Sequence, residues 1–152
     1  MVSQNSSKDL EGLLVVTVEQ AVAAPYTSCR LADAGARVIK VERPEGDFAR
    51  NYDSNALGNS AYFVWLNRGK ESIALDLKNK EDMVVFENII SKSDILIQNL
   101  APGAFERLGL NLKELRLKYP SLITCTISGF GDNGPYKNQK AYDMLIQAET
   151  GV

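Results

Sequence analysis

Four basic residues stand where a ligand that carries several phosphates could be held. Arg43, Lys78, Arg107 and Lys140 each follow one of the apolar runs predicted below to be strands. Guanidinium and ammonium groups bind phosphate oxygens through charge-assisted hydrogen bonds. A lone surface Arg or Lys is usually only solvated, but basic residues after successive strands favour a shared site. The sequence therefore predicts a polyanion site made from local positive charge.

Five short apolar runs are predicted to form the strands that position these residues. The runs are Leu13–Val18, Arg37–Glu42, Ser72–Asp76, Asp94–Gln98 and Leu122–Ser128. Leu13–Val18 is continuously apolar rather than alternating, which is typical of a strand covered on both faces.

Stretches with helical patterns lie between the strands. The predicted helices are Pro25–Ala34, Lys80–Ser91, Gly103–Leu108 and Leu112–Tyr119. In Lys80–Ser91 an apolar face is formed by Met83, Phe86, Ile89 and Ile90. Alternating strands and helices predict an α/β fold, a Rossmann-like open parallel sheet with helices on both faces. Ligands of such sheets bind at the carboxyl ends of the strands, where the basic residues stand.

The segment Arg43–Asn59 interrupts this alternation. It is rich in Gly, Asp, Asn and Ser and has no apolar periodicity. A loop of this length inside a compact domain is more often functional than accidental. We therefore expect it to contribute to the ligand site.

Composition excludes several other classes of protein. The net charge of −2 gives no electrostatic footprint for nucleic acid or for an anionic membrane. The chain has no histidine, and Cys29 and Cys125 stand far apart, so no metal site is predicted. Residues 1–8 are polar and lack the apolar stretch of a secretory signal, so we expect a flexible tail, a domain over residues 9–152 and a cytoplasmic protein.

The main alternative is that the fold is a Rossmann domain that binds a dinucleotide. Glu42 lies about where that fold places the acid that binds the ribose. The first turn, however, should read G-x-G-x-x-G, and after the first predicted strand no glycine occurs before Gly35. The pattern therefore disfavours NAD or NADP.

Several ordered motifs resemble the family III CoA-transferases, a group that includes formyl-CoA transferase, carnitine CoA-transferase and α-methylacyl-CoA racemase. The matching motifs run from Leu10 onward and include residues 31–44, Gly46-Asp47, residues 67–78, residues 94–103, Gly129-Phe130-Gly131, Gly134-Pro135 and Tyr142-Asp143. The resemblance implies that the chain is the N-terminal part of the CoA-binding large domain of a longer enzyme.

The resemblance also implies which residues contact a CoA thioester. They are Val22, Ala23, Ala24, Arg43, Leu75, Asp76, Leu77, Lys78, Asn99, Leu100, Ala101, Arg107, Lys140, Ala141, Tyr142 and Asp143. Two of them depart from the family pattern. Ala24 replaces a glycine, and Leu100 replaces an aromatic residue that could stack on the ligand.

In this family an aspartate attacks the acyl-CoA, which gives a mixed anhydride and then an aspartyl-CoA thioester that the acceptor acid resolves. By the family pattern that aspartate follows Val152, so no catalytic residue is assigned within the chain. Asp143 matches a second active-site carboxylate, although it could instead cap a helix. The implied partners are an acyl-CoA donor, a carboxylic acid acceptor and a second subunit in a homodimer.

Two further functions stay open at this point. A racemase of the same family would work by proton transfer, and such relatives place a histidine just before Asp143, where this chain has Tyr142. The third possibility is that the chain by itself is a non-catalytic CoA-binding module.

Overall fold

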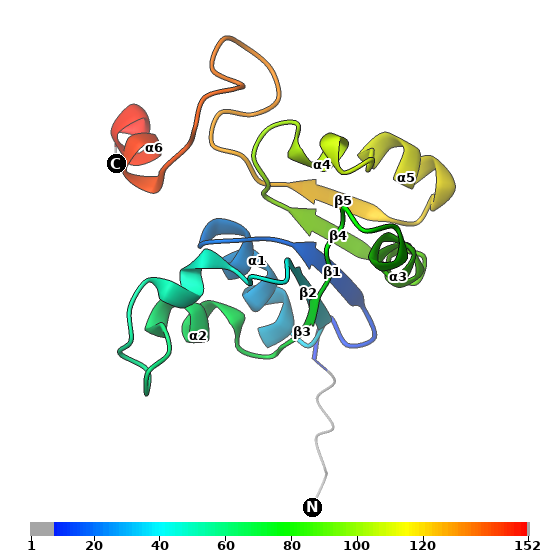
Figure 1. The fold of residues 1–152 in the computed structure, drawn as a ribbon, viewed down its shortest axis with the longest axis horizontal. Helices are drawn as coiled ribbons and strands as arrows, with labels where there is room; N and C mark the ends of the chain where they lie inside the picture. Colours follow the sequence, from blue (N-terminus) through cyan, green and yellow to red (C-terminus); the bar gives the residue numbers. More distant parts are fainter. Residues whose placement is uncertain (1–7, 152) are drawn as a thin grey trace, which may run out of the picture.

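A five-stranded parallel sheet forms the centre of the computed structural model, which describes residues 8–151 (Figure 1). The strands lie in the order β3-β2-β1-β4-β5. In chain order the elements are β1 Leu14–Val18, α1 Ala23–Asp33, β2 Arg37–Glu42, η1 Phe48–Asn51, α2 Ala61–Asn67, β3 Lys70–Ala74, α3 Lys80–Ile90, β4 Ile95–Gln98, α4 Ala104–Arg107, α5 Leu112–Lys118, β5 Ile123–Thr126 and α6 Asp143–Thr150. Of the predicted tail, residues 1–7 lie outside the described residues.

The central strand β1 is held on both sides by strands that are distant in sequence. It pairs with β2 from Leu14 opposite Arg37, and with β4 from Val15 opposite Ile95. The Asp94 carboxylate also accepts a hydrogen bond of 2.8 Å from the backbone N–H of Leu14, 80 residues earlier. All five carboxyl ends consequently meet at one edge of the sheet.

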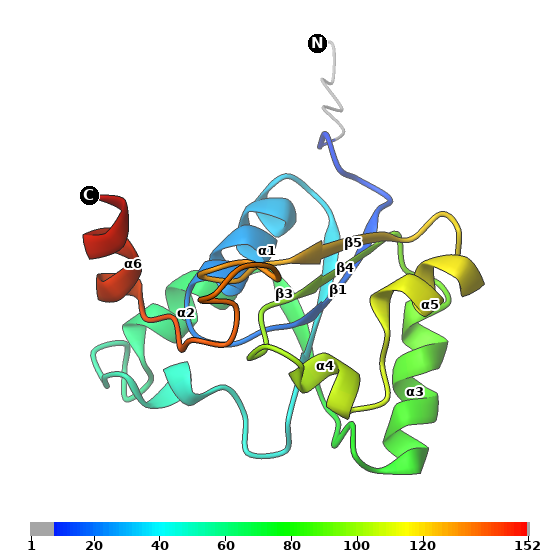
Figure 2. The ribbon, with the colours of Figure 1, turned by 90° about the horizontal axis from the view of Figure 1, so that it is seen from above.

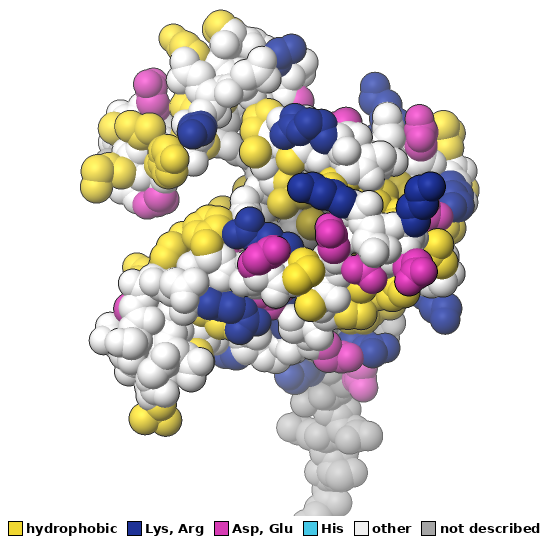
Figure 3. Space-filling view, viewed as in Figure 1, with side chains coloured by type: hydrophobic (Ala, Val, Ile, Leu, Met, Phe, Trp, Pro, Cys, Tyr) yellow, Lys and Arg dark blue, Asp and Glu magenta, His cyan; other side chains and the backbone are white. Residues whose placement is uncertain are grey.

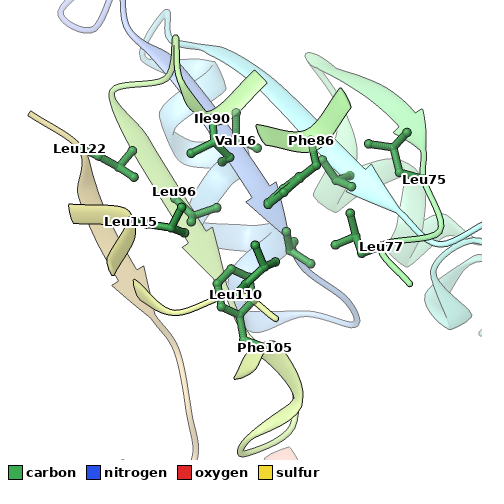
Figure 4. Packing of buried hydrophobic residues seen from close by; sticks show 12 residues of the cluster. Val16, Leu75, Leu77, Phe86, Ile90, Leu96, Phe105, Leu110, Leu115 and Leu122 are labelled. Carbon is green, nitrogen blue, oxygen red and sulfur yellow. The ribbon is translucent and has the colours of Figure 1, made fainter. Parts of the chain in front are cut away.

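Helices cover both faces of the sheet (Figure 2). On one face Phe86 and Ile90 of α3 pack with Leu96 of β4, together with Phe105 and Leu115 from α4 and α5 (Figure 4). On the other face Ala24 of α1 packs with residues that include Val15, Val38 and Ile97. Neighbouring residues of one strand thus enter opposite cores, as the pleat requires. The predicted α/β architecture is confirmed.

Helix starts differ in how their backbone N–H groups are satisfied. Side-chain oxygens of Ser60, Asn79 and Asn111 cap α2, α3 and α5. Val22 occupies the cap position of α1 and supplies no such bond. The first turn of α1 therefore keeps unsatisfied N–H groups at the carboxyl edge of the sheet.

The structure shifts several predicted bounds by one or two residues and adds elements that were not predicted, namely η1 and α2. Strand β3 runs from Lys70 to Ala74 rather than from Ser72 to Asp76. It pairs with β2, which ends at Glu42, and Glu42 is the partner of Ala74. The predicted loop 43–59 contains the short helix η1, and α2 follows it unpredicted. Among the described residues, no helix is both long and apolar enough to cross a membrane.

Candidate functional site

A pocket of about 370 Å³ opens at the carboxyl edge of β1, β2 and β3. Its walls come from the ends of these strands, from the start of the loop after β2 and from two leucines near α4. The lining residues are Val18, Glu19, Gln20, Val41, Glu42, Arg43, Pro44, Glu45, Gly46, Asp47, Leu75, Asp76, Leu77, Lys78, Leu100 and Leu108.

The structure brings one group of predicted site residues together around this pocket. These residues are Arg43, Leu75, Asp76, Leu77, Lys78 and Leu100. Leu75 and Leu77 are buried and belong to the core beneath the pocket, whereas Arg43 and Lys78 are exposed. The pocket therefore has an apolar floor and two basic side chains on its rim.

A second group lies beside the pocket without lining it. Val22 and Ala23 are exposed at the start of α1, while Ala24 is fully buried under it. Asn99 holds the turn before α1 through two hydrogen bonds to Gln20. Its side-chain oxygen accepts from the Gln20 N–H at 2.9 Å, and its side-chain amide donates to the Gln20 carbonyl at 2.9 Å. Ala101 is exposed just after β4.

Arg107 lies at the end of α4 and does not line the pocket. Its guanidinium is exposed and donates a hydrogen bond of 3.3 Å to the Pro102 carbonyl. Gly103, with φ of +70°, leaves the space that Arg107 fills, because a Cβ there would lie 2.9 Å from its Nη1. A side chain at position 103 would therefore displace the Arg107 guanidinium.

Lys140, Ala141, Tyr142 and Asp143 are exposed on the connection into α6 and do not line the pocket. Asp143 opens α6, where its carboxylate accepts a hydrogen bond of 2.7 Å from the Gln147 amide. Asp143 does not cap α6, because Tyr142 holds the cap position and no side-chain oxygen accepts from the first N–H groups of the helix. Close packing of Ala141 and Ile146 against Gly129 holds this segment beside the chain that leaves β5.

Acidic residues outnumber basic ones in the pocket lining, yet most of their charge is neutralised. Glu19 pairs with Lys70, Glu42 with Arg50 and Asp47 with Lys40, each at 2.7 Å. Of the lining carboxylates, only those of Glu45 and Asp76 are outside these ion pairs. Their two charges balance those of Arg43 and Lys78. Figure 3 likewise shows basic and acidic side chains interspersed on the face that it displays.

The buried part of this ion-pair network is the feature that sequence reasoning missed. Lys40 and Lys70 have side chains only 2% exposed, and the side-chain oxygen of Asn67 accepts from both, at 2.9 and 3.1 Å. The sequence feature that could have revealed the network is Lys40, which stands between Ile39 and Val41 in a predicted buried strand. A charge at such a position is buried only if it is paired.

Glu42 is the most strongly perturbed carboxylate of the pocket. Burial opposes its ionisation, but hydrogen bonds from Arg50, Ser72 and the backbone N–H of Asp47, with the charge of Lys40, together lower its pKa from 4.5 to about 2. Burial lowers the pKa of Lys70, and the adjacent Glu19 carboxylate opposes that shift. Glu42 is therefore ionised at neutral pH.

A family model and similar curated proteins point to the same family. The model of CoA-transferase family III matches residues 10–152. An acetyl-CoA:oxalate CoA-transferase of Acetobacter aceti is 42% identical over 93% of this chain and 37% of its own length. The human succinyl-CoA:glutarate CoA-transferase is 33% identical over 97% of this chain and 34% of its own length.

Solved structures agree with these sequence matches. A CAIB/BAIF family protein from Brucella suis superimposes with a TM-score of 0.88 at 38% identity, over 95% of this chain and 39% of its own. The Rv3272 protein of Mycobacterium tuberculosis gives the same TM-score at 34% identity, over 95% of this chain and 40% of its own. The chain thus spans about two fifths of the length of its relatives, and it belongs to CoA-transferase family III.

Proposed function

We propose that the carboxyl edge of the sheet binds the CoA part of an acyl-CoA. The pocket described above carries this proposal. Arg43 and Lys78 are exposed on its rim, and Leu75 and Leu77 form its apolar floor. A CoA thioester has phosphate groups for the basic side chains, and a pantetheine arm whose methylene and methyl groups can lie on the leucines. Pairing of Glu19, Glu42 and Asp47 with Lys70, Arg50 and Lys40 supports it, because these ion pairs reduce the repulsion between the pocket and phosphate.

The start of α1 and the end of α4 supply two more contacts in this proposal. The uncapped first turn of α1, where Ala23 is exposed, favours an anion. Arg107 offers an exposed guanidinium on the other side of the β4 turn. Lys140 and Asp143 join the site if the segment before α6 turns toward the ligand.

The reaction proposed for the whole enzyme is CoA transfer between an acyl-CoA and a carboxylic acid. An aspartate oxygen attacks the thioester carbonyl and CoA thiolate leaves, which forms a mixed anhydride. The thiolate then attacks the aspartyl carbonyl and releases the first acid, and the acceptor carboxylate repeats these steps in reverse. We assign the acyl-CoA and acid as substrates on the basis of what the family's named members transfer.

By the same resemblance the enzyme works as a homodimer. Side chains of Tyr142, Met144 and Leu145 at α6 are 62%, 81% and 51% exposed. Figure 3 shows their helix as an apolar surface at the upper left. Such a surface suits an interface with further protein.

We further propose that residues 1–152 alone bind CoA without transferring it. Most of the pocket's carboxylates are held in ion pairs, and Asp143 is engaged by Gln147. Incubation of the chain with succinyl-CoA and oxalate or glutarate is expected to leave the succinyl-CoA unchanged, as followed by liquid chromatography. Formation of the new CoA thioester would show that the chain holds its own nucleophile.

Substitution of Arg43 and of Arg107 tests the binding proposal. Arg43→Ala and Arg107→Ala are each expected to weaken CoA binding about 10-fold, since a hydrogen bond from a charged donor to phosphate contributes on the order of 1.5 kcal/mol. Isothermal titration of CoA into the three proteins measures this. Arg37→Ala is the matched control, because Arg37 is an exposed arginine at the opposite end of β2. Equal affinities in all four proteins would refute the proposed rim.

A further inference from the structure

We propose that Asp47 is a positioning residue that fastens the loop after β2 to the turn before α1, and so sets the geometry of the proposed CoA site. This inference rests on the function proposed above. It concerns a residue whose side chain the ligand itself does not need to touch.

The contacts of Asp47 join three parts of the fold. Its Oδ1 accepts from the backbone N–H of Ala21 at 3.1 Å and from that of Ala49 at 3.0 Å. Its Oδ2 accepts from Lys40 Nζ at 2.7 Å, and its own N–H donates to Glu42 Oε2 at 2.9 Å. The side chain of Asp47 is fully buried. One carboxylate therefore connects the turn before α1, strand β2 and helix η1.

The backbone conformation of Ala21 depends on the hydrogen bond from its N–H to Asp47. The φ of Ala21 is +64°, in the left-handed region that costs a residue with a Cβ about 1 kcal/mol or more. Ala21 directly precedes Val22 and the uncapped start of α1, so its conformation aims the N–H groups proposed to meet phosphate. The hydrogen bond to Asp47 stabilises that conformation from one side, while Asn99 holds the adjacent Gln20 from the other.

Asp47 also couples this turn to Arg43. The Arg43 guanidinium donates to the Gly46 carbonyl at 3.0 Å, one residue before Asp47. Loss of the Asp47 contacts releases the loop that holds Arg43 and the turn that holds Ala21 at the same time. Because Lys40 neutralises Asp47, the carboxylate can perform this task without repelling an anionic ligand.

Amide exchange and CoA titration of Asp47→Ala and Asp47→Asn test the inference. In the 15N-labelled chain Asp47→Ala is expected to speed exchange of the Ala21 amide at least about 10-fold, while the Gln20 amide, bonded to Asn99, stays protected. CoA affinity falls about 10-fold in Asp47→Ala. It falls less in Asp47→Asn, which keeps an oxygen for Ala21.

A double-mutant cycle with Arg43→Ala separates positioning from general loss of stability. If Asp47 positions Arg43, CoA affinity in the double variant falls by clearly less than about 100-fold, which is the product of the two single losses in affinity. Leu115→Ala is the control, because it lowers stability from the core at α5 without removing a hydrogen bond of Asp47 or Arg43, and its effect is expected to multiply with that of Arg43→Ala.

Unchanged Ala21 exchange in Asp47→Ala, or fully multiplicative losses in the cycle, would overturn the positioning role. If the unmutated chain binds no CoA, or binds it independently of Arg43, the proposed function fails instead. In that case the Ala21 exchange alone still decides whether Asp47 fastens the turn.

Discussion

Replacement of Lys40 by methionine is expected to lower the free energy of unfolding by roughly 3–5 kcal/mol, since it leaves a buried carboxylate without its counter-charge. The Lys40 side chain is 2% exposed, and Asp47, 2.7 Å away, is fully buried. The ammonium also donates to Asn67 and lies 5.2 Å from the centre of the Phe63 ring. Methionine offers no N–H donor that could replace these contacts. Urea denaturation followed by circular dichroism measures the loss.

A surface ion pair whose cation also lies on β2 provides the matched comparison. Arg37 of β2 and Glu71 of β3 also lie 2.7 Å apart, but their side chains are 62% and 57% exposed. Arg37→Met is expected to cost at most about 1 kcal/mol, as exposed ion pairs usually do. In Lys40→Met/Asp47→Asn the second change removes the orphaned charge, so part of the stability should return. A double variant less stable than Lys40→Met would contradict the assignment of the cost to that charge.

Phe86→Ala is expected to destabilise the chain by about 3–5 kcal/mol, because it opens a cavity at the centre of the larger core. Phe86 is fully buried between α3 and the sheet, near Val16, Leu75 and Ile90 (Figure 4). These neighbours belong to strands and a helix of a closely packed layer, which can relax only partly into the space left. The midpoint of urea unfolding should fall with little change in its slope.

Val84→Ala on the same helix is the control for Phe86→Ala. Val84 is 61% exposed, so its truncation is expected to change stability by no more than about 0.5 kcal/mol. Similar losses for the two variants would mean that α3 is stabilised by its own helix propensity rather than by its contact with the sheet.

Apolar periodicity predicted the parts of the fold that burial alone determines. Strand β2 has the predicted bounds, and Phe86 and Ile90 lie in the core as their helical spacing indicates. Helix α2 was missed, although Ser60 caps it and Leu66 is buried. It covers little of the sheet, and its exposed Tyr62 and Trp65 blur the amphipathic pattern.

The candidate site could be predicted only where single residues carry the signal. Arg43 and Lys78 stand on the pocket rim as strand-end position predicts. The pairing of Lys40 with Asp47, and of Lys70 with Glu19, depends on which strands become neighbours. Lys70 and Glu19 are 51 residues apart, and no local pattern brings them together. Contacts that the tertiary fold creates cannot be read from spacing along the chain.

The long interval between β1 and β4 has a consequence for synthesis of the protein. The bond from Leu14 to Asp94 spans 80 residues, which a ribosome adds over roughly 4–16 s at 5–20 residues per second. During that time β1 can pair with β2 on one side, while its other side exposes unpaired backbone N–H and C=O groups. An open strand edge is a template for pairing with other chains. The nascent polypeptide therefore exposes this edge of β1 until Ile95 emerges, and a chaperone bound in that interval would shield the edge that β4 later covers.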